Sequence, residues 1–386
     1  MRRLALLAGA IVLVDTMFYA AITPLLPELA DELGLGKNGA GVLAGAYAAG
    51  TLIGALPAGV LAARAGVKPA VLAGLSLMAA SGVAFAFGRS IAVLDAARFL
   101  QGIGGACSWA GAMAWLASTV PAERRGEVLG AALGAAIFGV QLGPIVGAVA
   151  TAIGREAAFS TTVAFGAALA AWAWRTPAPA GGAEALLAAP ARALRERGIR
   201  VGLWLTALPA LAFGVLDVLA PLRLDALGAG GAAVGAVFFA AAGLEAFVSP
   251  AAGRLSDRRG AAPVARAGLV AGGVGLLVLP LPASAWVMGA AVVAVAGALG
   301  VLWVPAMALL TGGADRIGLA QGLAFGLFNL AWAAGFTVGS GAGGALAQAS
   351  TDALAYASVA AAYAITAAAA WRARGRRPVA PLPFGR

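Results

Sequence analysis

The sequence predicts an all-α integral membrane protein, with twelve transmembrane helices in two six-helix bundles related by a pseudo-twofold axis. Three observations carry this prediction. The 386 residues are 62% apolar and only 11% charged, whereas soluble domains carry about 25% charged residues. Twelve apolar stretches are long enough to cross the hydrocarbon core of a bilayer, which takes roughly 20 residues. The second half of the chain also repeats landmarks of the first half.

The twelve stretches are interpreted as helices, because membrane-spanning strands would be shorter and would alternate in polarity. They lie near residues 4–27, 39–63, 67–88, 91–118, 128–153, 157–174, 201–222, 230–252, 264–282, 285–311, 319–347 and 353–371. The segment between the sixth and seventh stretches is less apolar and contains Pro177, Pro179 and Gly181. We therefore expect a first bundle over 1–175, a cytoplasmic linker over 176–200, a second bundle over 201–372 and a basic cytoplasmic tail over 373–386.

The basic residues test this topology. With a cytoplasmic N-terminus, 21 of the 26 Lys and Arg residues fall in cytoplasmic loops, the linker or the tail, as the positive-inside rule requires. The net charge of +10 is thereby explained by topology, so no nucleic-acid partner is expected. We expect a multi-pass protein of the cell membrane, surrounded by lipid, with both termini in the cytoplasm.

The composition also argues against several kinds of site. There is no histidine, and Cys107 is the single cysteine. Ser-His-Asp triads and histidine zinc sites are therefore excluded, and no internal disulfide can form. We expect neither an enzyme nor a bound metal or other cofactor.

The two halves repeat each other at nearly constant spacing. At an offset of 194 residues, Gly59, Arg64 and Gly66 recur as Gly253, Arg258 and Gly260. At an offset of 192, five glycines between 126 and 147 recur between 318 and 339. Six helices in each half give both copies the same orientation. This is the arrangement of transporters that rock two parallel halves around a site at the membrane midplane.

These motifs resemble the major facilitator superfamily over the whole chain. The loop that begins at Gly59 resembles the family's G-x-L-x-D-R-x-G-x-[RK] pattern, although Ala63 replaces the aspartate, and the loop from Gly253 keeps an aspartate at Asp257. The fourth helix, from Arg98 to Gly104, resembles the R-x-x-Q-G-x-G pattern. The fifth helix contains a glycine and proline motif similar to that of the drug:proton antiporter branch. The resemblance implies residues that control conformation, namely Gly59, Arg64, Gly66, Gly253, Asp257, Arg258, Gly139, Gly143, Pro144 and Gly147.

The first helix narrows the resemblance. Asp15, followed by Pro24 and Pro27, has a spacing similar to vesicular amine transporters and tetracycline-type exporters. Those amine transporters place an acid where Asn329 stands and another where Gly300 stands. The resemblance therefore favours export without implying specificity for monoamines.

Charged residues within the spans are candidates for function, because each costs about 2.5–3.5 kcal/mol at the membrane centre. We predict proton coupling by Asp15, Glu245, Asp217 and Arg98. Structural interpretations stay open: Asp15 as a hydrogen-bonded carboxyl, Asp217 in an ion pair with Arg223, and Arg98 paired with Asp95 three residues before it. The predicted substrate-binding residues are Asp15, Tyr19, Gln101, Gln141, Asn329 and Trp332.

Two functions within this fold stay open. The antiporter motif and Asp15 favour a multidrug-type exporter, an antiporter that moves small hydrophobic or cationic compounds out in exchange for protons by alternating access. The alternative is a proton-coupled importer of a small nutrient such as a sugar or an organic acid. Sugar sites need many amide and carboxylate groups, and these spans hold few. We expect a monomer that uses the proton gradient as its energy source.

Overall fold

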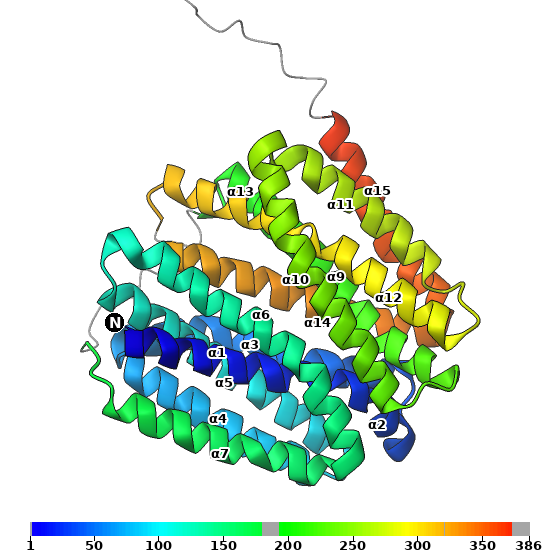
Figure 1. Ribbon diagram of the computed structural model, residues 1–386, viewed down its shortest axis with the longest axis horizontal. Coiled ribbons are helices and arrows are strands. Elements are labelled where there is room, and N and C mark those ends of the chain that lie inside the picture. Colours follow the sequence, from blue (N-terminus) through cyan, green and yellow to red (C-terminus); the bar gives the residue numbers. More distant parts are fainter. Residues whose placement is uncertain (1, 180–192, 320, 373–386) are drawn as a thin grey trace, which may run out of the picture.

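The computed structural model describes residues 2–179, 193–319 and 321–372, and this part of the chain is helical and contains no strand (Figure 1). The helices of the first half are α1 (Arg2–Ala20), the short 3-10 helix η1 (Thr23–Leu25), α2 (Leu26–Leu33), α3 (Lys37–Arg64), α4 (Val67–Phe87), α5 (Ile91–Thr119), α6 (Ala122–Ile153) and α7 (Arg155–Arg175). Those of the second half are α9 (Arg197–Ala226), α10 (Gly231–Arg259), α11 (Ala261–Val278), α12 (Ala285–Gly300), α13 (Trp303–Arg316), α14 (Gln321–Ala349) and α15 (Asp352–Arg372). The all-helical fold is therefore confirmed.

Eleven helical segments in the described part are long and apolar enough to cross a membrane. The remaining predicted span is α5, which is 29 residues long but is not among those eleven because Arg98, Gln101 and many small residues lower its average hydropathy. It packs against α1, α3 and α4, so its polar side chains are shielded from lipid by neighbouring helices. The predicted domain boundaries stay predictions, and most of the linker and the tail, 180–192 and 373–386, lie outside the described residues.

Two predicted spans are interrupted. The first is divided into α1, η1 and α2, which contain Pro24 and Pro27 near the breaks. Proline has no backbone N–H and removes helical hydrogen bonds, so the chain continues after a short 3-10 turn. The tenth span ends α12 at Gly300 and resumes as α13 at Trp303. The sequence predicted continuous helices at both places.

Each half is held together by a face of glycines. A Cβ added to any of these glycines would lie under 3.0 Å from the neighbouring helix, closer than real Cβ atoms come. Small residues allow such close approach between membrane helices. Along α6 and α14 the contacts are Gly139 with Leu13, Gly143 with Met17, Gly147 with Ala21, Gly335 with Ala207, Gly339 with Leu211, and Gly343 with Val215.

These contacts correct the register of the internal repeat. The partners on α1 and α9 are 194 residues apart, whereas the glycines that contact them, such as Gly139 and Gly335, are 196 apart. The sequence paired Gly143 with Gly335 at an offset of 192, and that pairing is wrong by about one helical turn. A glycine at every fourth position matches itself after a shift of four residues, so the pattern alone does not fix the register.

The two halves meet closely at one end, where α3 and α10 begin and α6 and α14 finish; we call this the closed end. A Cβ on Gly41 would lie under 3.0 Å from the backbone of Ser340, and one on Gly344 equally close to the backbone of Lys37. On the other side of the interface, Gly235 of α10 packs in the same way against the backbone of Pro144. These contacts hold the backbones of the two halves against each other at the closed end.

Polar contacts also join the halves at the closed end. The Lys37 ammonium lies 2.5 Å from a carboxylate oxygen of Asp352. The backbone N–H of Asn38 donates to Gln348 Oε1 at 2.8 Å. The start of α3 is therefore joined across the interface to the start of α15 by an ion pair and to the end of α14 by a hydrogen bond.

The opposite end is loosely packed. Four glycines near that end, Gly59, Gly130, Gly318 and Gly326, have no neighbouring atom within 4 Å of an added Cβ, whereas others such as Gly198 and Gly313 pack closely within their own half. Figure 1 shows the axes of α10, α11 and α15 inclined to those of α1, α4 and α7. Together with the closed end, this indicates two halves that lean on each other at one end and separate toward the other.

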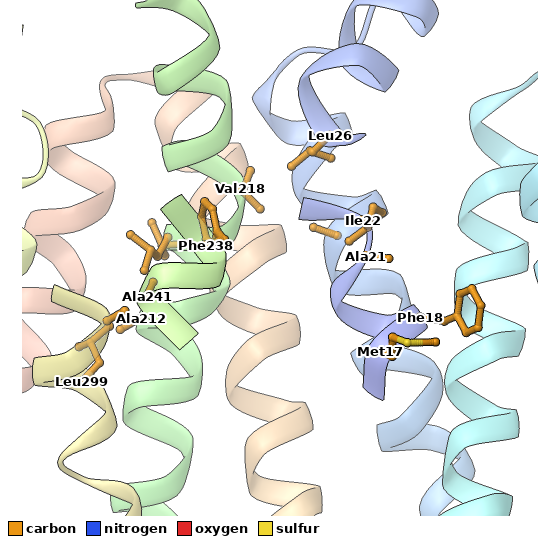
Figure 2. Close-up of a cluster of buried hydrophobic side chains, with 14 of the residues drawn as sticks. Met17, Phe18, Ala21, Ile22, Leu26, Ala212, Val218, Phe238, Ala241 and Leu299 are labelled. Atoms are coloured by element: carbon orange, nitrogen blue, oxygen red, sulfur yellow. The ribbon is translucent and has the colours of Figure 1, made fainter. Parts of the chain in front are cut away.

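The buried apolar core extends through both halves (Figure 2). Met17, Phe18 and Ile22 contribute from the first span, and Val218 and Phe238 from α9 and α10. The outer surface is also apolar, with Trp286 91% exposed and Phe247 80% exposed. Soluble proteins rarely expose large apolar surfaces, so these side chains are suited to contact lipid.

Candidate substrate and proton site

The first-half site is built around Asp15 on α1. This carboxyl is only 1% exposed. Its Oδ2 accepts hydrogen bonds from the Tyr47 hydroxyl at 2.7 Å and from Trp109 Nε1 at 3.1 Å. Its Oδ1 is buried without a partner. One carboxylate oxygen is therefore held by two donors, and the other is available to a proton or a cation.

Arg98 of α5 lies in the same region and is fully buried. It donates to the carbonyl oxygens of Phe18 and Tyr19 at 3.2 and 2.9 Å, and to Gln101 Oε1 at 2.8 Å. The two carbonyls lie at the last turn of α1, where helical acceptors lack intrahelical partners. The break after α1 therefore supplies the acceptors that hold the guanidinium.

The pair between Asp95 and Arg98 that the sequence left open is not formed in the described structure. Arg98 turns toward α1, and Asp95 Oδ1 is buried without a hydrogen bond. Three residues along a helix place two side chains on one face, but the α1 carbonyls and Gln101 occupy the guanidinium. Gln101 is thereby engaged by Arg98 through its side-chain oxygen.

Aromatic rings continue the site from the first half into the second. Tyr19 lies with its ring centre 4.7 Å from that of Tyr47, 5.3 Å from that of Trp332 and 5.8 Å from that of Phe336. The Arg98 guanidinium lies 5.3 Å from the ring centre of Tyr47. We call Tyr19, Tyr47, Trp332 and Phe336 the aromatic cluster.

The second half contains a separate carboxyl site. Glu245 of α10 accepts a hydrogen bond of 2.6 Å from Trp303 Nε1 on α13. Phe213 of α9 stacks on Trp303, with ring centres 6.1 Å apart. Asp217 is close enough to Glu245 for electrostatic interaction, and no ion pair joins it to Arg223 among the described residues. Glu245 therefore has an indole partner within the protein.

The other predicted substrate residues have fewer contacts. Gln141 on α6 and Asn329 on α14 are half-buried, and their side chains make no hydrogen bond in the described structure. Tyr47, Trp109 and Trp303 were not among the predicted site residues. The 194-residue spacing between the two tryptophans is the signal that would have identified them together.

The two loops that begin at Gly59 and Gly253 lie at the loosely packed end. Gly66 and Gly260 adopt φ angles of 105° and 83°, which favour glycine. Arg64 and Arg258 are exposed and have no acidic partner within the described residues. The side chain of Asp257 lies outside the described residues. The charge latch implied by these loops stays a prediction.

Buried carboxyls and a buried arginine between two helical bundles are features of membrane transport proteins. The chain belongs to the Major Facilitator Superfamily, whose sequence profile matches residues 8–323 and 203–385. It is therefore a multi-pass transporter and not an enzyme, which confirms the resemblance noted in the sequence.

Vesicular transporters are similar to parts of the chain. The human synaptic vesicular amine transporter is 43% identical over 91 residues, which are 23% of this chain and 18% of that protein. The probable vesicular acetylcholine transporter-B of Danio rerio is 34% identical over 158 residues, 38% of this chain and 32% of that protein. The chain thus spans less than a third of the length of these curated relatives.

Solved structures show the same fold along nearly the whole chain. A D-xylose-proton symporter superposes with a TM-score of 0.74 at 19% identity and covers 96% of both chains. The E. coli xylose transporter in a partially occluded inward-open conformation gives 0.75 at 17% identity, over 100% of this chain and 98% of that one. An inward-facing bacterial homologue of the lysosomal transporter Spinster gives 0.75 at 16% identity, over 98% of both.

Proposed function

We propose that the protein exports small hydrophobic or cationic compounds in exchange for protons. The observation that carries this proposal is the environment of Asp15, a buried carboxyl with one oxygen unpartnered and aromatic rings beside it. The partial similarity to the vesicular amine transporter supports the same class of compound. Aromatic faces attract cations, so the cluster is suited to a flat cationic substrate.

Competition at Asp15 provides the coupling. Burial favours the neutral form of a carboxyl, and an adjacent cation favours the charged form. Proton and cationic substrate therefore exclude each other from the free Oδ1. A ligand shifts a conformational equilibrium only through different affinities for the two states. Exchange follows when the protonated and the substrate-bound carboxyl favour opposite conformations.

Arg98 and the two donors tune this competition. Tyr47 and Trp109 stabilise the charged carboxylate through hydrogen bonds, which opposes the effect of burial. Arg98 adds a positive charge nearby, and its bonds to the carbonyls of Phe18 and Tyr19 tie it to the helix that carries Asp15. These bonds therefore keep the positive charge beside the helix that carries Asp15.

The position of the closed end indicates to which side of the membrane the described conformation opens. With a cytoplasmic N-terminus, as the positive-inside rule predicts, the closed end faces outward. The described state is then inward-facing and can receive substrate from the cytoplasm of the cell. The open space beside Gly130 and Gly326 at the loosely packed end supports this assignment.

The test uses purified protein in lipid vesicles with an imposed pH gradient, acid inside. Protein inserted with its cytoplasmic side facing outward makes export appear as uptake into the vesicle. The transported probe is ethidium, a flat monocation. We expect ethidium to accumulate in vesicles that contain the protein, and accumulation to vanish with nigericin or in empty vesicles. In vesicles with the gradient reversed, acid outside, proton-driven accumulation of xylose, together with no ethidium transport in the acid-inside vesicles, would establish the importer instead and overturn the proposal.

A further inference from the structure

The two halves hold matching pairs of an indole and a carboxyl. Trp109 of α5 and Trp303 of α13 are 194 residues apart, the offset that relates the α1 and α9 contact residues. The first donates its indole N–H to Asp15 at 3.1 Å, and the second donates to Glu245 at 2.6 Å. In each half, therefore, the tryptophan at the equivalent repeat position donates a hydrogen bond to a carboxylate.

The carboxylates themselves are not repeats of each other. The residue 194 positions after Asp15 is Pro209, and the residue 194 positions before Glu245 is Thr51. One acid comes from the first helix of its half and the other from the second helix. The two tryptophans therefore lie at the repeat offset, and the two acids do not.

A glycine lies against each carboxyl, on the same span as the tryptophan, and leaves room for the acid side chain. A Cβ on Gly105 would lie 3.0 Å from both oxygens of Asp15. A Cβ on Gly300 would lie 2.6 Å from Glu245 Cγ. A side chain at either glycine would displace the acid. The two sites are thus built in the same way, with an indole donor and a glycine beside each acid.

One oxygen of each acid remains free. Asp15 Oδ1 has no partner, and the only hydrogen bond of Glu245 in the described structure is through Oε1. Between the acids lie aromatic rings from both halves. Tyr19 contacts Phe336 across the interface, and Phe213 stacks on Trp303. These rings, with Trp332, belong to one continuous packed group.

We propose that the preferred substrate carries two cationic groups joined by an apolar or aromatic spacer. One cation meets Asp15 Oδ1 and the other meets the free oxygen of Glu245, while the spacer lies along the aromatic rings. Two carboxylates neutralise two cations, whereas a monocation leaves the second carboxylate to a proton. This inference rests on the proposed export of cations and specifies the substrate class for the same site.

The experiment compares two dyes with the same ring system. Ethidium carries one cationic group and propidium carries two, and both report binding to the purified protein by fluorescence. We expect propidium to bind tighter than ethidium. Glu245→Gln, which keeps an amide oxygen for Trp303, should weaken propidium by about tenfold or more, the expected cost of losing one buried charge partner, and change ethidium by less than twofold. Asp15→Asn should weaken both dyes.

The control is Asp95→Asn, which removes a buried span carboxyl outside the site and should alter neither dye. Equal loss of both dyes in Glu245→Gln, or equal binding of both dyes to the parent protein, would overturn the two-cation inference. Ethidium binding would still stand in that case, and with it the proposed function. If neither dye binds the parent protein, both the inference and the proposed export of such cations are wrong.

Discussion

Closure of the two halves depends on a glycine that faces the partner half, and this gives a sharp test. Gly344 of α14 lies against the backbone of Lys37, so that an added Cβ would be under 3.0 Å away. Gly341, three residues earlier on the same helix, has nothing within 4 Å of its Cβ position. Gly344→Ala and Gly341→Ala therefore form a matched pair on one helix.

The expected magnitude follows from packing. Overpacking a close contact costs about 1–3 kcal/mol, and the cost applies only when the closed end is closed. Alanine in place of glycine also favours the helix by about 1 kcal/mol, but it does so equally in both conformations. A difference of about 1–3 kcal/mol shifts a two-state equilibrium about 5- to 150-fold. Gly344→Ala should therefore favour opening of this end by that factor.

The assay measures the distance between spin labels on the two halves at the closed end. Cys107, the only native cysteine, is first replaced by alanine, and labels are then placed at Asp31 and Ala232, both exposed. Gly344→Ala should increase the population with a long distance. Gly341→Ala should keep the distribution of the parent protein. Equal distributions in all three proteins would refute the idea that these backbone contacts hold the end closed.

Three further predictions concern other contacts. Lys37→Gln should change the ratio of long-distance to short-distance label populations by less than about fivefold, because partly exposed ion pairs contribute only about 0–1 kcal/mol. Adding Asp352→Asn to this variant should have no further effect on that ratio. Tyr47→Phe removes a donor to the charged form of Asp15, so the pH of half-maximal ethidium binding should move upward; an unchanged pH profile would remove Tyr47 from the site. Gly143→Ala should lower the free energy of unfolding by about 1–3 kcal/mol through overpacking against α1, detected as a lower melting temperature with unchanged label distances.

The general fold was predictable because it depends on averaged properties. Length, hydropathy and the positions of Arg residues need no knowledge of packing, so the helical spans followed from them, and the family followed from its loop and helix motifs. The register of the glycine faces did not, since a glycine every four residues matches itself after one turn. The breaks near Pro24 and at Gly300 also escaped, because proline and glycine occur within intact helices elsewhere, as Pro144 does in α6.

The site was predictable only in part. Asp15 was recognised because an acid in a membrane span requires a reason. Its partner Tyr47 was not, because a tyrosine within an apolar helix usually packs like any other ring. Arg98 was recognised as a charged residue in a span, but local spacing left a pair with Asp95 open, whereas the contact that decides its position comes from carbonyls at the end of α1, about 80 residues earlier. Long-range contacts of this kind leave no mark in local sequence.

Transport by Asp15→Asn measures the central claim most directly. In vesicles with an acid interior, the variant should lose proton-driven accumulation of ethidium, because an amide neither binds nor releases a proton. Exchange of labelled for unlabelled ethidium without a gradient should persist to the extent that the aromatic rings still hold the dye. Asp95→Asn, examined in parallel, should accumulate ethidium as the parent protein does. If Asp15→Asn still concentrates ethidium like the parent protein, Asp15 is not the coupling residue and the mechanism proposed here is wrong.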